Sequence, residues 1–209
     1  NDTVINTYRK QTGPYFGNRH NLAAGLRLKP DSVTNILFNV AFMDANGEDQ
    51  RMTSIQTTNN KTGPLNTGDI DLKYDNQIYT YRHNISITKL SRIKKGRRFT
   101  LGHDMDYRNS ETDNFSLSQN HFMYPVLFDS VIRQLRQERI PTTELNTYFN
   151  YNEPLTKTTI LRLGARYEFL KYNNSIETYN FNTVSKSYDL FNLLLTNSLQ
   201  RKNNQVTAN

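Results

Sequence analysis

Alternating polarity is the feature that most constrains what this chain can form. In one segment, Leu161, Leu163 and Tyr167 fall on one face of an extended strand, whereas Arg162 and Glu168 fall on the other. The same alternation recurs in at least five other segments. Strands with one apolar and one polar face either cover a protein core or form a barrel wall that faces lipid.

We expect a strand wherever this alternation occurs. The expected strands, each with one uncharged face, cover 22–28, 36–42, 79–87, 99–107, 145–151, 160–169 and 191–195. They are joined alternately by short turns at 30–32, 94–96 and 153–156 and by long polar stretches at 44–77, 108–143 and 171–187. We therefore predict an all-β, antiparallel up-and-down meander over residues 1–209, with short turns on one rim and long loops on the other.

Parity predicts how neighbouring strands pair. Residues that face each other in a hairpin must lie on the same side of the sheet. The apolar positions on both sides of Lys95 are odd, so the connecting loop must have an odd length. A turn at 94–96 with a left-handed Gly96 satisfies this condition. It would place Ile87 opposite His103 and His83 opposite Tyr107, and the same parity holds for the hairpins around Asp31 and Leu155.

Composition narrows the class of protein. The chain has 13 Tyr and 11 Phe, too many for a disordered polymer, and its lack of cysteine leaves no disulfide or thiolate site. The formal net charge is +7, but the basic residues are dispersed among turns and strand faces, so we predict no nucleic-acid partner. No run of 18 or more apolar residues occurs, which argues against a transmembrane helix but not against alternating barrel strands.

The length of the apolar stripes favours a membrane. The stripe from Phe99 to Tyr107 corresponds to roughly 30 Å of strand. Tilted by about 40°, it spans roughly 23 Å, close to the apolar band of outer-membrane barrels. Aromatic residues lie near both ends of the stripes, as in the two aromatic girdles of such barrels. We prefer this interpretation to a soluble sheet, although aromatic residues are common in any strand.

One short motif carries a family resemblance. The segment Tyr151-Asn152-Glu153-Pro154-Leu155 resembles the Tyr-x-Glu-Pro-Leu turn of TonB-dependent-receptor-like outer-membrane β-barrel proteins. The strand that follows, 161–167, resembles the Leu-x-x-Gly-x-x-Tyr pattern of that family. Tyr188-Asp189-Leu190 and Phe42-Met43-Asp44 also fit, and the residue-level match lies mainly in 143–199.

The resemblance implies a barrel of about 22 strands with a plug domain and a periplasmic energy-coupling motif, the TonB box. This chain contains neither the plug nor the TonB box, and its length suits about a third of such a barrel. We therefore expect the C-terminal portion of the barrel, as a fragment. No substrate or coupling residue of the family can be carried onto these positions.

Two pairs of residues could carry chemistry. His83 and His103 fall on the apolar face of neighbouring strands, where a metal pair is conceivable, but amphipathic side chains near a membrane rim or in a core fit better. Asp104 and Asp106 could form an acid–base pair, but charges that face a lumen near Arg82, Arg162 or Arg166 fit better. No recognisable catalytic or nucleotide-binding motif occurs, so we predict no enzyme, cofactor or metal.

One stretch has helical spacing. Residues 129–139 begin with Asp-Ser and place Val131, Ile132 and Leu135 on one helical face. This stretch could form a loop helix that contacts cargo. We favour the alternative, a polar extension of a β-hairpin.

The sequence therefore predicts an outer-membrane barrel segment of a TonB-dependent-receptor-like transporter that takes up a bulky nutrient. The residues predicted to face the lumen are Asn39, Arg82, Asp104, Asp106, Arg162, Arg166 and Glu168. The residues predicted to face lipid are Phe38, Val40, Ile85, Ile87, Leu101, Met105, Leu161, Leu163 and Tyr167. Outer-membrane lipid, the periplasmic energy-coupling protein and a surface lipoprotein are the expected partners, and the long loops are expected to meet cargo.

Two alternatives stay open at this stage. The first is a non-transporting outer-membrane barrel that anchors or assembles a surface complex. The second is a soluble periplasmic or secreted β-sandwich that binds a ligand.

Overall fold

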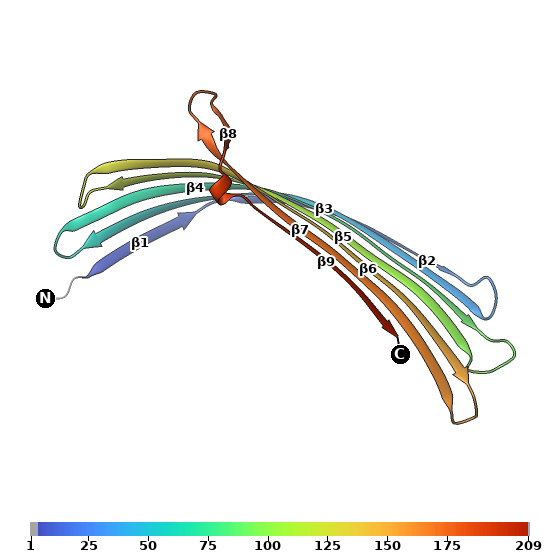
Figure 1. Ribbon diagram of the computed structural model, residues 1–209. Helices are drawn as coiled ribbons and strands as arrows, with labels where there is room; N and C mark the ends of the chain where they lie inside the picture. The colour runs from blue at the N-terminus through green and yellow to red at the C-terminus, as the bar shows by residue number, and fades with distance from the viewer. Residues whose placement is uncertain (1–3, 209) are drawn as a thin grey trace.

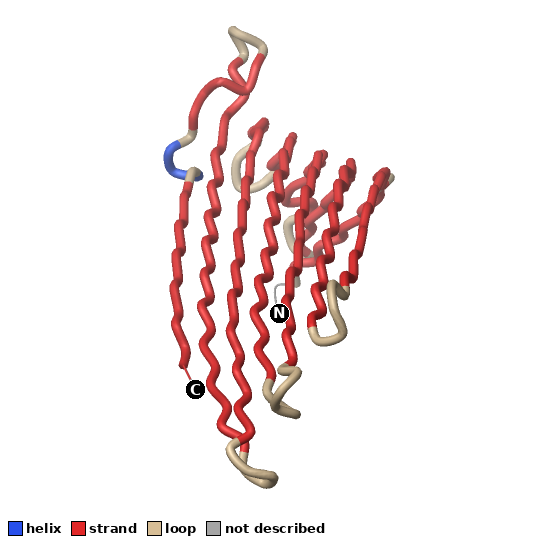
Figure 2. Tube along the Cα trace, turned by 90° about the vertical axis from the view of Figure 1, so that its right-hand side faces the viewer, coloured by secondary structure: helices blue, strands red, loops and turns tan. Residues whose placement is uncertain are grey.

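The structure, a computed structural model, describes residues 4–208 as one antiparallel sheet of nine strands. The strands lie side by side in a layer that arches along its length, as Figure 1 and Figure 2 show, and the hairpin around residues 183–186 rises out of this layer. The elements are β1 (Ile5–Thr12), β2 (Tyr15–Leu28), β3 (Thr34–Asn59), β4 (Gly63–Leu90), β5 (Arg98–Phe122), β6 (Phe128–Pro154), β7 (Ile160–Asn182), β8 (Ser187–Phe191), the 3-10 turn η1 (Leu193–Leu195) and β9 (Asn197–Ala208). The predicted all-β antiparallel meander is confirmed.

The nine strands occupy seven positions in the sheet. β1 and β2 both pair with β3 in one register and are separated only at Gly13-Pro14. At the other end, β8 and β9 both pair with β7 and are separated by η1. Because successive positions alternate in direction, the first and the last position run the same way. The sheet is not closed into a barrel, and these two positions form its free edges.

The long polar stretches are strands, so the prediction of long loops on one rim is wrong. β3 and β4 pair from Thr34–Lys89 to Asn59–Gly63, and β5 and β6 pair along their whole lengths up to Phe122–Phe128. The connections at this end are only residues 60–62, 123–127 and 183–186. In residues 44–64 most side chains on both faces are polar, which removes the alternation that reveals a strand. Residues 69–75 do alternate, with Ile70, Leu72 and Tyr74 on one face, and the sequence analysis missed this signal.

The stretch with helical spacing belongs to β6. Residues 129–139 pair residue by residue with β5, from Asp129–His121 to Arg139–Glu111. The favoured prediction of a hairpin extension is therefore confirmed, and the loop helix is wrong.

The hairpin parity is confirmed, whereas the exact pairing is wrong. The loops at 29–33, 91–97 and 155–159 all have odd lengths, but Ile87 pairs with Leu101 and His83 with Met105. The inner turn does form at Lys94–Gly96: Arg97 N–H donates to the Lys94 carbonyl oxygen at 3.1 Å, and Gly96 has φ 92°. The loop is longer because Ser91 Oγ accepts hydrogen bonds from the backbone N–H groups of Ile93 and Lys94, at 3.2 and 3.1 Å.

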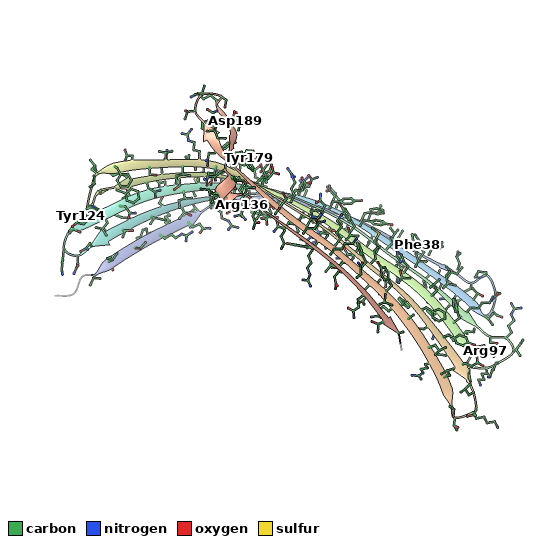
Figure 3. The ribbon with its side chains drawn as sticks, in the orientation of Figure 1. Phe38, Arg97, Tyr124, Arg136, Tyr179 and Asp189 are labelled. Carbon is green, nitrogen blue, oxygen red and sulfur yellow. The ribbon has the colours of Figure 1, made fainter. Side chains whose placement is uncertain are left out.

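The sheet has no hydrophobic core of its own. Among residues 4–208, the buried residues are Thr53, Gly68, Thr80, Gly102 and Thr178, and no apolar side chain is buried. The accessible surface is 14622 Å², whereas a compact folded monomer of 24.4 kDa exposes about 10,000 Å². Side chains project from both faces without a second layer over them, as Figure 3 shows. No helix in the described part of the chain is long and apolar enough to span a membrane.

A substitution at the junction between β1 and β2 tests how firmly β1 is paired at the edge of the sheet. A β-carbon on Gly13 would overlap the backbone carbonyl oxygen of Gln50, which cannot rotate away. We expect Gly13→Ala to cost about 1–3 kcal/mol of unfolding free energy, as overpacking typically does. It should also speed amide hydrogen exchange in Ile5–Thr12. In the matched control Gly25→Ala, the β-carbon meets only the Asn39 side-chain oxygen at 2.8 Å, so exchange in β1 should not change.

Candidate functional site

The register assigns every strand residue to one of two faces. Residues that pair across strands share a face, and successive residues of a strand alternate. One face is apolar over a belt at the end of the sheet that carries the turns at 29–33, 91–97 and 155–159. One row of this belt crosses all seven positions as Leu26, Phe38, Ile85, His103, Thr147, Tyr167 and Val206. The opposite face is polar over the same length.

Aromatic side chains border the apolar belt on both sides. Near the border toward the hairpin extensions, the ring centroids of Phe42 and Tyr81 lie 5.0 Å apart. On the border toward the turns, those of Phe99 and Phe149 lie 5.3 Å apart. Beyond the first border the same face becomes charged, beginning with Asp44 opposite His20. The belt is therefore a bounded strip and not the whole face.

All residues predicted to face lipid lie on the apolar face. They are Phe38 and Val40 of β3, Ile85 and Ile87 of β4, Leu101 and Met105 of β5, and Leu161, Leu163 and Tyr167 of β7. Several are well exposed for apolar residues, with Leu163 at 48% and Leu101 at 41%.

All residues predicted to face a lumen lie on the polar face, and most of them meet in one hollow. Asn39, Arg82, Asp104, Asp106 and Glu168 line a depression of about 940 Å³ that crosses the sheet from β2 to β9. The depression extends over all seven positions and its charged lining residues belong to the polar face, so we interpret the polar face as concave there. Two predicted residues lie outside it, Arg162 and Arg166, which are closer to the turn at 155–159.

A hydrogen-bonded row runs across the floor of this hollow, which we name the amide row. Its members are Asn39, Asn84, Asp104 and Asn146, on β3, β4, β5 and β6. Asn146 Nδ2 donates to Asp104 Oδ2 at 3.1 Å, Asn84 donates to the other oxygen of that carboxylate, and Asn39 Nδ2 donates to Asn84 Oδ1 at 3.5 Å. The sequence analysis missed Asn84 and Asn146 as site residues, although their parity assigns them to this face.

Ion pairs hold the neighbouring charges. Arg82 Nε lies 2.5 Å from Asp106 Oδ2, and Arg166 Nη1 lies 3.4 Å from Glu168 Oε1. Of the arginines predicted to lie near Asp104 and Asp106, Arg82 pairs with Asp106, whereas Arg166 pairs with Glu168. The amide row and these pairs offer a fixed pattern of donors and acceptors to a polar ligand and no activated nucleophile.

The two histidines of the apolar face lie close together. The rings of His83 and His103 have centroids 5.2 Å apart. Each Nδ1 is hydrogen-bonded to a hydroxyl group, that of Tyr81 at 2.9 Å for His83 and that of Thr147 at 2.8 Å for His103. Among residues 4–208 no group of three or more His, Cys, Asp or Glu side chains could hold a metal ion.

A charged cluster joins two neighbouring turns at the end of the sheet, where Figure 3 labels Arg97. Glu153 accepts hydrogen bonds from Arg97 Nε at 2.6 Å and Nη2 at 2.8 Å, from Lys94 Nζ at 2.6 Å and from the Tyr151 hydroxyl at 2.6 Å. These bonds, led by that from Arg97, hold the pKa of the Glu153 carboxyl well below its usual range. The Tyr-x-Glu-Pro-Leu segment thus ties the turn at 155–159 to the loop at 91–97.

Comparisons with known proteins give no assignment. No model of a known protein family matches the chain, and no curated protein matches it in sequence.

The Glu153 cluster predicts a specific pH dependence. Because the folded pKa is lowered, the stabilisation is fully present above the ordinary value of 4.5 and is lost as the pH falls below it. We expect Glu153→Gln to lower stability at pH 7 and to flatten the decline in stability between pH 5 and pH 2, measured by denaturant unfolding.

The control for this experiment is Glu144→Gln on the same strand. Glu144 forms no ion pair within residues 4–208, so this variant should keep the wild-type pH slope. An unchanged slope in Glu153→Gln would contradict the assigned role of the cluster.

Proposed function

We propose that this chain is part of a bacterial outer-membrane β-barrel, the wall of a TonB-dependent-receptor-like transporter for a bulky nutrient. In this proposal, the apolar belt meets lipid and the concave polar face lines the lumen. The observation that carries it is the belt itself: a bounded apolar strip across every position of a sheet that has no core.

The height of the belt supports the membrane assignment. From the row of Tyr107 to that of Phe99, the strands advance about 26 Å. A tilt of about 40° reduces this to roughly 20 Å along the membrane normal, near the apolar band of outer-membrane barrels. The aromatic borders fit the interfaces on either side, where rings with one polar edge are favoured.

The missing core supports the same assignment on energetic grounds. Burying a single Leu or Phe side chain contributes about 1.5–3 kcal/mol, and this sheet leaves a whole belt of them open to solvent. Lipid covers such a belt without a second protein layer. A sandwich formed by this chain alone would need a second sheet, whereas residues 4–208 form one.

The directions of the two edge strands determine whether this sheet could close into a barrel by itself. β2 and β9, the edges at the level of the belt, run the same way, so they cannot pair with each other in antiparallel fashion. An antiparallel barrel has an even number of strands. Closing this wall therefore takes an odd number of further strands, which agrees with a larger barrel.

The polar face favours transport over simple anchoring. A wall that only anchors a complex has no need of a depression with ordered donors and acceptors, such as the amide row and its ion pairs. The hairpin extensions, and not long loops, would carry cargo contacts beyond the membrane. The plug, the energy-coupling protein and a surface lipoprotein remain part of the proposal through the family resemblance.

A matched pair of arginine substitutions tests the lipid-facing belt. Ile85 is in the middle of the belt, and Ser86 follows it on the polar face opposite Gly102. We expect Ile85→Arg to cost about 2–4 kcal/mol of unfolding free energy in phospholipid vesicles, as Arg does on the lipid face at mid-bilayer. Ser86→Arg should cost much less, because its side chain reaches water in the lumen.

Two results would contradict the membrane assignment. One is an equal cost for the two variants in vesicles. The other is a chain that folds cooperatively as a monomer in buffer without detergent or lipid.

A further inference from the structure

A second hollow on the polar face is lined by three arginines. It has a volume of about 460 Å³ and contains Arg19 of β2, Arg82 of β4 and Arg108 of β5. We name it the arginine hollow. The register puts the three residues in successive rows, because Arg19 pairs with Ala45, Arg108 with Thr80 and Arg82 with Ala41.

Short side chains create the space between these arginines. Ala23, Ala41 and Ala45 line the floor with Thr80, which is one of the few buried residues of the sheet. Met43 and Ile78 also line the hollow, so its space lies between the arginine side chains and a floor of small and apolar residues. The arginine hollow is therefore a depression bordered by positively charged side chains.

Within the described part of the chain, two of the three arginines of the arginine hollow have no carboxylate partner. Arg82 is paired with Asp106, but Arg19 donates only to the neutral Asn21 side chain, at 3.4 Å. Over residues 4–208 no carboxylate oxygen lies within ion-pair distance of Arg19 or Arg108. The residues that line the hollow include no acid.

The adjacent, larger hollow differs from the arginine hollow in the charge of its lining residues. It shares Arg82 with the arginine hollow, but it also contains Asp104, Asp106, Glu144 and Glu168. The two depressions therefore present opposite charges on one concave surface. Like charges in a concavity reinforce one another and raise the local concentration of counter-ions.

We propose that the arginine hollow binds an oxyanion, a carboxylate or a phosphate group carried by a ligand. Arginine suits this role because its planar guanidinium group donates two parallel hydrogen bonds to such a group and stays charged at any working pH. That the ligand is transported cargo rests on the proposed function. The anion site itself rests on the geometry of the hollow and on the charges of Arg19 and Arg108, unpaired within residues 4–208, with Arg82 at its border.

Titration of the purified full chain with citrate and pyrophosphate tests this site. Isothermal calorimetry in low salt should give a measurable affinity for at least one of these probes, and the affinity should fall as salt is raised. Arg19→Gln and Arg108→Gln should each weaken binding roughly tenfold or more, because each removes charge-assisted hydrogen bonds. Arg108→Lys should recover part of the loss.

Two controls make the result specific. Arg162→Gln removes an arginine from the same face outside both hollows and should leave the affinity unchanged. Triethyl citrate has the shape of citrate without its charge and should not bind. Binding of citrate alone, of pyrophosphate alone or of both supports the site and identifies the oxyanion.

The site would be overturned if neither probe binds, if triethyl citrate binds as well as citrate, or if Arg162→Gln weakens binding as much as Arg108→Gln. Failure of the membrane assignment is distinguishable from these outcomes. It appears in the comparison of Ile85→Arg with Ser86→Arg, and the anion titration can then be run in buffer alone.

Discussion

Continuous cross-strand pairing is the constraint on which this structure depends. A sheet without a core is held by its backbone ladder and by the pairs of side chains along each row. β4 and β5 pair from Asn66–Phe122 to Leu90–Arg98 without a shift in register. A slip of one residue would move every apolar side chain of the belt to the polar face. The belt, the amide row and the arginine hollow therefore exist only together.

The sequence analysis identified most of the strand segments whose two faces differ and missed those whose faces are alike. Leu161 and Leu163 alternate with Arg162, so β7 and its faces could be predicted. Residues 44–64 have mostly polar side chains on both sides, and their strand is held by cross-strand pairs such as Ser54 with Asp69 at 2.6 Å. Such pairs are known only once the register is known. The Ser91 bonds that lengthen the loop at 91–97 leave no periodic signal either. The alternation at 69–75, in contrast, was present in the sequence and was overlooked.

For the candidate site, the sequence predicted which face each residue is on but not which side chains are in contact. Parity assigned Asn39, Arg82 and Asp104 to one face, but it could not tell which side chains meet, because that depends on the stagger between strands. Asn84 and Asn146 were missed because single asparagines suit solvated positions as well as hydrogen-bonded rows. Arg19 and Arg108 were missed because both lie just outside the expected apolar strands, Arg19 before the first of them and Arg108 in a stretch interpreted as a connection.

The charges of the polar face explain why Arg82 occupies the border between the two hollows. On one side lie Asp104 and Glu168, and on the other lie Arg19 and Arg108. The ion pair of Arg82 with Asp106 neutralises one charge of each sign where the two fields meet, so each hollow keeps its own sign. A ligand with both an anionic and a cationic group could then span the border in one orientation only. The order of negative and positive side chains on successive rows of the polar face would thus set the orientation of such a ligand.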